Sequence, residues 1–308
     1  EQMRVPLGVI GMIYESRPNV TIDAAGLSIK SGNSIVLRGG SEAINSNLVL
    51  SDIIKSSLRE CHMPVDMVQT IETTDRVAVS EILKCDKYID VIIPRGGKSL
   101  IQKISSESKI PVIKHLDGNC HVYIDKYADP KTAFNCTINS KTQRYGVCNA
   151  AESLIVHKSF PKSHIAKILS ELDHHLVEIR GCKKIKSIFK KAHLAKESDW
   201  YEEYLRPVIS VKIVNNIDEA IEHIEKYGSK HTDSIITTNK ISRDRFLREV
   251  DSSSVMVNTS TRFADGFEYG LGAEIGISTD KIHARGPVGL DGLTNLKYVV
   301  TSNGVVRN

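Results

Sequence analysis

The chain has 308 residues, a length suited to two domains of ordinary size and too great for one small core. Its 41% hydrophobic and 25% charged residues are typical of a soluble globular protein. A net charge of +4, with both signs interspersed, does not support a nucleic-acid or membrane-binding footprint. The longest apolar runs are of strand length and the first residues are polar, so we predict neither a membrane span nor a signal peptide.

Cysteine spacing bears on the compartment and on metal binding. No two of the 6 cysteines form a C-x-x-C motif, and their spacings match neither a zinc site nor a compact disulfide framework. The 11 histidines are scattered along the chain. We therefore predict a reduced, cytoplasmic protein without a bound metal.

The first part of the chain alternates strand patterns with helix patterns. Strands are predicted at 5–14, 34–38, 67–71, 88–94 and 110–114, and helices at 20–30, 42–59, 75–85 and 98–106. Such alternation indicates an α/β domain with a mostly parallel sheet and helices on both faces. Because such sheets bind ligands beyond the carboxyl ends of their strands, we expect functional residues there.

A second α/β set follows. Strands are predicted at 122–125, 153–157, 207–214, 234–237 and 254–257, and helices at 130–140, 160–174, 218–227 and 242–250. The lysine-rich residues 183–196 are predicted to be a solvated surface segment. From Thr259 the chain is glycine-rich and loop-like, and Asn303-Gly304 predicts a hairpin between strands at 296–301 and 305–307. The domain boundary is expected near 116–119.

One cysteine, Cys148, lies in a polar, glycine-containing stretch between a helix pattern and a strand pattern, residues 141–152. Lys141 and Arg144 are close to it in sequence, and nearby positive charge favours the nucleophilic thiolate. The alternative is a buried thiol that acts as a small hydrophobe, the more common role of a free cysteine. Local sequence by itself favours that alternative.

Two strand-to-helix turns carry a cation and a pair of glycines. One is Arg38-Gly39-Gly40, and the other is Arg95-Gly96-Gly97-Lys98. The second is not a P-loop, because Ile92 stands where that motif needs a glycine. Both turns suit a phosphate at a helix N-terminus, although neither forms the G-x-G-x-x-G fingerprint. The alternative is a pair of tight structural turns with a solvated Arg38.

Three further polar loops contain an arginine. Arg17 follows the first strand and could bind a carboxylate or phosphate, and Asn19 beside it could donate to an oxyanion. Arg262 lies in the loop 258–263 and Arg285 in the loop 283–287, which could recognise a small anionic substrate. The alternatives are a turn in which Asn19 caps the next helix, and ordered surface loops.

Seven blocks, taken in order, resemble one family. They are residues 5–20, 31–42, 88–97, 110–125, 141–157, 250–266 and 269–290. They are spread in family order over nearly the whole chain, which resembles the gamma-glutamyl phosphate reductases (glutamate-5-semialdehyde dehydrogenases) of the aldehyde dehydrogenase superfamily. Family members carry a helical segment and a hairpin strand before Val5, so the chain is expected to lack part of the cofactor domain.

The resemblance implies an aldehyde dehydrogenase-like α/β fold with two three-layer, parallel-sheet domains. Residues 1–117, completed by about 266–290, would form the NADP-binding domain, and 118–265 the catalytic domain. Residues 291–308 would form an oligomerisation arm. A homo-oligomer is therefore expected, with substrate channelled from glutamate 5-kinase and with neither a nucleic-acid nor a membrane partner.

The implied activity is NADPH-dependent reduction of L-glutamate 5-phosphate to L-glutamate 5-semialdehyde and phosphate, the second step of proline biosynthesis. By resemblance, Cys148 would attack the acyl phosphate and form a thioester, which hydride converts to a hemithioacetal and then to the aldehyde. The implied catalytic residues are Cys148, through its thiol and its backbone N–H, and Asn19 as a second oxyanion donor. The implied cofactor-binding residues are Arg38, Gly39, Gly96, Gly97 and Glu203. The implied substrate-binding residues are Arg17, Arg262 and Arg285.

One departure from general aldehyde dehydrogenases bears on the reaction. Their Glu-Leu-Gly-Gly motif supplies a glutamate that helps to hydrolyse the thioester, whereas this chain has His115-Leu116-Asp117-Gly118. The change suits an enzyme that reduces its acyl intermediate. Alternatives are the reductase module of a bifunctional pyrroline-5-carboxylate synthase and a non-catalytic truncated fragment.

Overall fold

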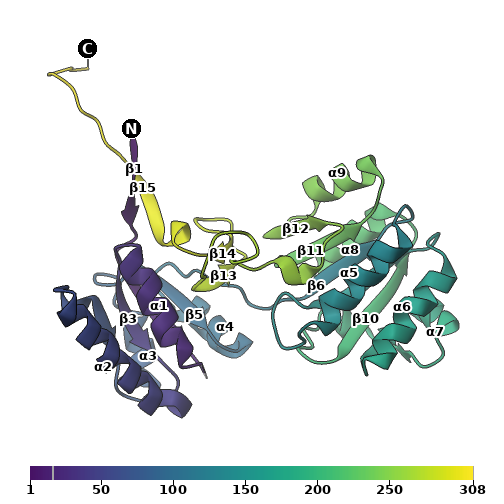
Figure 1. Ribbon diagram of the computed structural model, residues 1–308, viewed down its shortest axis with the longest axis horizontal. Helices are drawn as coiled ribbons and strands as arrows, with labels where there is room; N and C mark the ends of the chain where they lie inside the picture. The colour runs from purple at the N-terminus through teal and green to yellow at the C-terminus, as the bar shows by residue number, and fades with distance from the viewer. Residues whose placement is uncertain (16, 308) are drawn as a thin grey trace. The chain divides into compact units, whose positions relative to one another are not determined.

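The computed structural model describes residues 1–15 and 17–307. They form two compact units, one of Glu1–Lys114 with Gly270–Asn308 and one of His115–Tyr269 (Figure 1). Each unit is built on a parallel β-sheet covered by helices, so the predicted α/β class is confirmed. Within the described residues, no helix combines the length and apolar character needed to cross a membrane.

The first unit contains a four-stranded parallel sheet. Its strand order is β4 (Val68–Thr70), β3 (Ser34–Arg38), β2 (Val9–Tyr14) and β5 (Val91–Arg95). The chain runs from β2 outward to β3 and β4, and then returns to β5 on the other side of β2. The strand order therefore reverses between β2 and β5, the kind of position where open α/β sheets bind ligands.

Alternating side chains of β2 pack on opposite faces of this sheet. Met12 belongs to the core under α1 (Asn19–Lys30) and α2 (Ile44–Glu60), and Ile13 belongs to the core under α3 (Val77–Ile82) and α4 (Lys98–Glu107). Figure 1 shows α1 and α2 together on one face. This period of two is the expected result of a strand buried on both sides.

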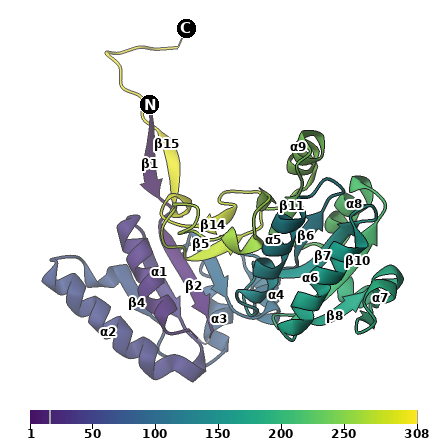
Figure 2. The same cartoon turned by 45° about the vertical axis from the view of Figure 1, so that its right-hand side comes forward.

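Two small antiparallel pairs complete the first unit. β1 (Gln2–Pro6) pairs with β15 (Thr294–Tyr298) in a ribbon that joins the two ends of the unit's chain (Figures 1 and 2). β13 (Gly276–Ser278) pairs with β14 (Gly286–Val288). Short 3₁₀ helices over both units are η1 (Ser41–Ala43), η2 (Val65–Met67), η3 (Glu197–Trp200), η4 (Thr261–Phe263) and η5 (Asp291–Leu293).

The second unit has a seven-stranded parallel sheet. Its order is β12 (Ser254–Val257), β11 (Thr232–Ile236), β6 (Cys120–Ile124), β7 (Ala151–His157), β10 (Val208–Val214), β8 (Glu178–Gly181) and β9 (His193–Leu194). One face packs against α5 (Pro130–Thr142), α6 (Lys162–His174) and α7 (Lys183–Ile188), and the other against α8 (Ile217–Tyr227) and α9 (Lys240–Glu249) (Figure 2). Side-chain caps fix several helix starts: the Asp129 carboxylate accepts a hydrogen bond from the Thr132 N–H at 2.8 Å.

The first predicted strand, 5–14, is wrong as one continuous element. The chain breaks at Gly8, whose φ of +127° L side chains rarely adopt. Val5 pairs with Asn295 in the ribbon, whereas Val9 pairs with Ser34 in the sheet. A prediction made from apolar periodicity did not detect this break. The strand predicted at 110–114 is reduced to one bridge between Val112 and Ile92.

Two other predictions are corrected. Residues 183–196 are not wholly solvated, because they form α7 and β9 and bury Ile185 and Ala192 completely beneath exposed lysines. The hairpin at Asn303-Gly304 is wrong as well. The described residues after β15 form no strand, and β15 finds its partner in β1 at the other end of the sequence.

Candidate active site

Cys148 lies half-buried in the loop between α5 and β7, at the amino edge of the seven-stranded sheet. The loop before β6 packs directly on its backbone: a Cβ at Gly118 would lie 1.9 Å from the Cys148 carbonyl oxygen. The Cys120 thiol donates to the same oxygen at 3.1 Å, and burial raises the pKa of Cys120 well above its usual range. Cys120 is thus a buried, inert thiol that supports the loop holding Cys148.

The amino edge is not where parallel-sheet topology predicts a site. α5 runs back against the direction of the strands, so its last turn and the following loop return to the amino edge. There the loops that precede β6, β7 and β11 come together, because these three strands are neighbours in the sheet. Cys148 is therefore surrounded by residues from segments far apart in the sequence.

Two histidines flank the thiol at this edge. His115 precedes β6 and His231 immediately precedes β11. One ring nitrogen of each and the Cys148 Sγ all lie within 4.8 Å of one another, and the two rings meet edge to face with centroids 5.4 Å apart. His231 is buried, and its Nδ1 is 2.8 Å from the Thr232 Oγ1. His115 is only half-buried.

Lys141 does not act on the thiol as its sequence position suggested. It is fully buried and forms an ion pair with Glu152, with Nζ and Oε2 2.5 Å apart. The other carboxylate oxygen of Glu152 accepts the Leu205 N–H at 3.1 Å. Burial raises the pKa of Glu152 to about 7 and lowers that of Lys141, opposing their mutual attraction. The pair holds together the helix, the strand and the 203–205 loop around Cys148.

Glu203 connects the same loop to the segment below the thiol. Its carboxylate accepts the Gly118 N–H at 2.8 Å. Gly118 in turn contacts the Cys148 backbone, as described above. A series of contacts between carboxylate side chains and backbone groups therefore connects Glu152, the 203–205 loop and Gly118 to Cys148.

Arg262 reaches the Cys148 region because the chain reverses after β12. Asn258 adopts a positive φ of 54°, and its side chain bonds both the N–H and the C=O of Thr237. The returning segment then contacts the Cys148 loop: Arg262 Nε donates to Gln143 Oε1 at 2.8 Å, and Asn149 Nδ2 donates to the Ala264 carbonyl at 2.9 Å. Burial lowers the pKa of Arg262, and a charge at Cys148 counteracts that shift.

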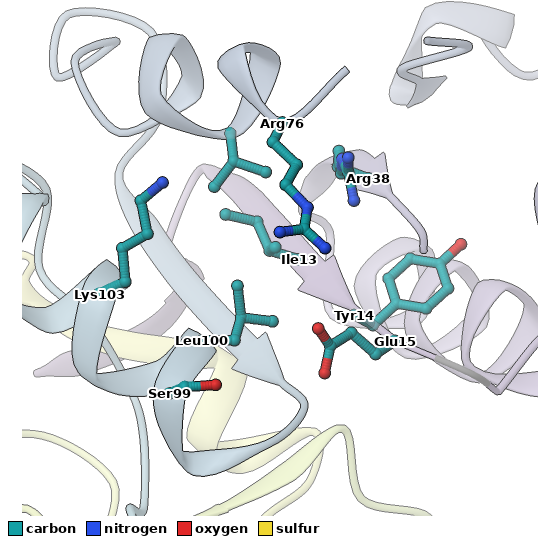
Figure 3. A pocket seen from close by; sticks show the side chains of 9 residues that line it. Ile13, Tyr14, Glu15, Arg38, Arg76, Ser99, Leu100 and Lys103 are labelled. Atoms are coloured by element: carbon teal, nitrogen blue, oxygen red, sulfur yellow. The ribbon is translucent and has the colours of Figure 1, made fainter. Parts of the chain in front are cut away.

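The first unit has a cavity of about 270 Å³ at the carboxyl ends of its strands (Figure 3). Figure 3 shows Arg76 and Arg38 on one side of the cavity and Ser99 and Lys103, from α4, on the other. The Arg38 guanidinium is buried and donates to the carbonyls of Gly39 and Thr74 at 3.0 and 3.1 Å. Among the described residues, Arg38, Arg76 and Lys103 form no ion pair, so their charges face the cavity or solvent.

The glycine turn after β5 contacts the carboxylate of Glu15, which lines the same cavity. The Glu15 Oε2 accepts the Gly97 N–H at 3.1 Å, at the position that caps α4. A Cβ at Gly96 would lie 2.6 Å from that oxygen. The turn thus places an anionic side chain against a helix N-terminus, and the phosphate site predicted there stays a prediction.

Comparison with known proteins identifies the family. Residues 1–179 match the aldehyde dehydrogenase family model. Over 100% of its length the chain is 48% identical to gamma-glutamyl phosphate reductase from Thermotoga maritima, of which it covers 74%, with a TM-score of 0.98. The chain belongs to the gamma-glutamyl phosphate reductase family. The family predicted from the sequence is confirmed, together with its aldehyde dehydrogenase-like fold.

Two more distant structures share this reductase fold. An acetylating aldehyde dehydrogenase from Geobacillus thermoglucosidasius has 20% identity and a TM-score of 0.74 over 100% of this chain and 77% of its own. An engineered glycolyl-CoA reductase with bound NADP⁺ has 17% identity and a TM-score of 0.71 over 96% and 75%. The aldehyde dehydrogenase family, to which this chain belongs, uses NAD or NADP as its cofactor.

The structure of this reductase-family chain divides the predicted site residues between its units. The second unit brings together Cys148, Arg262 and Glu203. The first unit contains Arg17, Asn19, Arg38, Gly39, Gly96, Gly97 and Arg285. Of these, Asn19 is exposed and its amide donates to Asp23 on its own helix at 2.9 Å. Arg17 is exposed, and Arg285 is half-buried in the loop before β14.

Sequence reasoning missed several residues of both sites. His115 and His231 were not assigned a role, because their spacing from Cys148 matches no motif and only the sheet order brings them together. Arg76 and Lys103 line the cavity without any glycine or strand signal beside them. The Lys141–Glu152 pair had one detectable signal, a lysine and a glutamate on either side of the cysteine.

Proposed function

We propose that this chain reduces L-glutamate 5-phosphate with NADPH to L-glutamate 5-semialdehyde and inorganic phosphate, the second step of proline biosynthesis. The observation that carries the proposal is the 48% identity to a gamma-glutamyl phosphate reductase over the whole chain. We assign NADP(H) binding to the first unit, covalent catalysis to the second and subunit contacts to residues 291–308.

Cys148 is the proposed nucleophile. Its thiol proton passes to a neighbouring imidazole, for which His115 is the more exposed candidate within 4.8 Å. Catalytic hydrogen bonds are often long before substrate binds, so this separation is compatible with proton transfer. The thiolate attacks the acyl carbon, the bond to phosphate breaks, and a thioester remains on Cys148.

The protonated imidazole also explains why the thioester is reduced. While His115 holds the thiol proton it cannot act as a base toward water, unlike the glutamate of general aldehyde dehydrogenases. Reduction gives a hemithioacetal, and its collapse returns the aldehyde and the Cys148 sulfur. The Cys148 backbone N–H and an amide such as Asn19 are the proposed oxyanion donors, each worth about 3–4 kcal/mol of barrier.

The anionic substrate needs cations near the thiol. Arg262 is held beside the Cys148 loop by Gln143 and is partly buried, which strengthens its interaction with a carboxylate or phosphate. We assign it to the substrate. Arg17 and Arg285 are our further candidates for substrate binding.

The residues of the first unit's cavity fit a phosphate-bearing nucleotide. The buried Nε of Arg38 has no hydrogen-bond partner among the described residues, and Arg76 and Lys103 add positive charge. The Gly97 N–H already donates to an anionic partner, the Glu15 carboxylate. NADPH bound there would supply the hydride. We also assign Glu203 to cofactor binding. The three cations favour NADPH over NADH, because NADPH has one more phosphate.

Two further assignments complete the proposal. We place the protein in the cytoplasm, since all six cysteines are free, as in a reducing compartment. We also propose that it forms a homo-oligomer and receives its labile acyl phosphate from glutamate 5-kinase.

The test is NADP⁺ reduction with L-glutamate 5-semialdehyde, measured with and without inorganic phosphate. The proposal expects reduction that requires phosphate, because phosphate must release the acyl group from Cys148. Equal rates without phosphate would identify an aldehyde-oxidising hydrolytic enzyme. Cofactor binding without turnover would identify a non-catalytic binding protein, and either outcome contradicts the proposal.

A further inference from the structure

Three side chains at the amino edge of the second unit have the composition of a zinc site. The Cys148 thiol, His115 and His231 each offer one ligand atom, and these atoms all lie within 4.8 Å of one another. Thiolate and imidazole are the ligands that Zn²⁺ prefers, and a site with three protein ligands keeps a fourth position open. None of the three is an acidic surface residue, unlike the ligands of many chance clusters.

The distances allow coordination after a small movement. Zinc bonds of about 2.3 Å to sulfur and about 2.0–2.1 Å to nitrogen put tetrahedral ligand atoms roughly 3.3–3.6 Å apart. The ligand atoms must therefore approach by about 1 Å. Cys148 and His115 are half-buried on loops and can move by side-chain rotation, whereas His231 is buried and fixed.

The residues around His231 hold its imidazole ring in an orientation that suits a metal ligand. Its Nδ1 lies 2.8 Å from the Thr232 hydroxyl and 3.8 Å from the Cys120 sulfur. In the tautomer in which Nδ1–H donates to the Thr232 hydroxyl, this hydrogen bond fixes the ring plane, and Nε2 carries the lone pair that a metal ligand needs. Edge-to-face contact with His115 holds the second ring beside it.

We propose that Cys148, His115 and His231 form a Zn²⁺ site through which zinc reversibly blocks the nucleophile. Coordination replaces the thiol proton: the S–H bond breaks, the S–Zn bond forms, and one proton is released to solvent. Arg262 beside the Cys148 loop opposes the charge of the cation and limits its affinity. The zinc site rests on the geometry of the second unit, whereas its effect as a block rests on the proposed function of Cys148 as the nucleophile.

The experiment is alkylation of Cys148 by iodoacetamide, followed by peptide mass spectrometry, in a titration with ZnCl₂ alone. No substrate or cofactor is present, so the outcome is independent of the proposed reductase activity. We expect Zn²⁺ to slow alkylation at least about tenfold and EDTA to restore it, because the coordinated sulfur is no longer a free nucleophile. An unchanged alkylation rate at saturating ZnCl₂ would overturn the proposal.

Four variants locate the site. His115→Gln and His231→Gln should each weaken zinc protection at least about 100-fold, since the loss of an outer-shell partner alone costs about 10–100-fold. Thr232→Val, which leaves all three ligands in place, should weaken it about 10–100-fold. It keeps the test decisive if His231→Gln does not fold, which thermal unfolding will show. Protection that persists in both His115→Gln and Thr232→Val would contradict the proposal.

The matched control is the double variant His174→Gln/His175→Gln. These residues, with Glu171, form the other histidine-containing cluster among the described residues, on the exposed end of α6. Zinc protection of Cys148 should be unchanged in this control. Loss of protection there would place the zinc at α6 and refute the assignment to Cys148.

Discussion

The two units use opposite edges of their parallel sheets. In the first, the cavity lies at the carboxyl ends of β2 and β3, where parallel sheets usually bind ligands. In the second, Cys148 lies at the amino edge, among the loops that precede β6, β7 and β11. The charges also differ. Arg38, Arg76 and Lys103 of the first unit have no ion-pair partner among the described residues, whereas Lys141 and Glu152 of the second neutralise each other.

This difference separates two tasks. Charges that face a cavity are available to an anionic ligand, so the first unit is suited to binding. Charges that pair with each other inside the protein, as Lys141 and Glu152 do, hold neighbouring backbone segments in place. The second unit is therefore suited to holding one nucleophile in a defined position. The comparison predicts that substitutions at the amino edge of the second unit damage stability and turnover. Substitutions at the carboxyl edge of the first unit should change mainly the affinity for the cofactor.

The largest effect on stability is expected from breaking the buried ion pair. Lys141→Met leaves the Glu152 carboxylate buried without its partner, which costs about 3–5 kcal/mol of unfolding free energy. The double variant Lys141→Met/Glu152→Leu should recover most of that loss, because it removes both charges. Urea denaturation at pH 8 measures the unfolding free energy of both variants. A double variant as unstable as the single one would show that the residues hold the loop by more than their charges.

The pair should also make stability depend on pH. The pKa of Glu152 is raised from 4.5 to about 7, so the folded protein holds a proton that the unfolded chain has lost between these values. Stability contributed by this group is present at low pH and declines as the pH rises toward 7. At roughly 1.4 kcal/mol per pKa unit, the decline amounts to about 3 kcal/mol.

Glu152→Gln removes this titration and is the matched comparison. The unfolding free energy of the wild type should fall relative to that of the variant between pH 4.5 and 7.5. A difference that stays constant across this range would contradict the raised pKa.

Close packing beneath Cys148 predicts a smaller loss. A Cβ in Gly118→Ala would overlap the Cys148 backbone, 1.9 Å from its carbonyl oxygen, so the loop must shift. We expect about 1–3 kcal/mol of destabilisation together with a fall in kcat. In Gly146→Ala, two residues from Cys148, the nearest atom would be 3.8 Å away, and stability should change by less than about 0.5 kcal/mol. Equal effects of the two substitutions would contradict this account.

At the cavity of the first unit, we expect substitutions to change only the binding of the cofactor. Arg76 is exposed and lines the cavity, so Arg76→Ala should raise the KM for NADPH about tenfold, or about 1.4 kcal/mol, with kcat and stability unchanged. The KM for NADH should change less. Arg59→Ala, an exposed arginine on α2, is the control. A loss of kcat in Arg76→Ala would break the separation between binding and chemistry.

Much of the fold could be predicted because helix and strand periods alternate clearly. The strand at Ser34–Arg38 was predicted to the residue, and the helix from Pro130 with only a two-residue error at its end. The predictions failed where the tertiary structure overrides the local sequence pattern. The break at Gly8 depends on one positive φ, and the partner of β15 lies at the far end of the sequence. The sequence pattern did not reveal the burial of Ile185, because lysines surround it in the sequence.

The site was predictable only in part, for a similar reason. Cys148 and Gly118 stand in recognisable blocks, and Arg38 and the two glycine pairs follow strands. His115 and His231 come to the thiol because β11, β6 and β7 are neighbours, and strand order cannot be derived from spacing along the chain. The roles assigned to Asn19, Arg17 and Arg285 stay predictions.

The most direct test of the central claim is phosphate-dependent NADP⁺ reduction by Cys148→Ala with L-glutamate 5-semialdehyde. Cys182→Ser is the matched control, because Cys182 is also half-buried in the second unit but lies at the N-terminus of α7. If Cys148 is the nucleophile, the alanine variant loses at least about 1000-fold in rate while the control retains the wild-type rate. Phosphate-dependent reduction that survives in a folded Cys148→Ala protein would contradict the account.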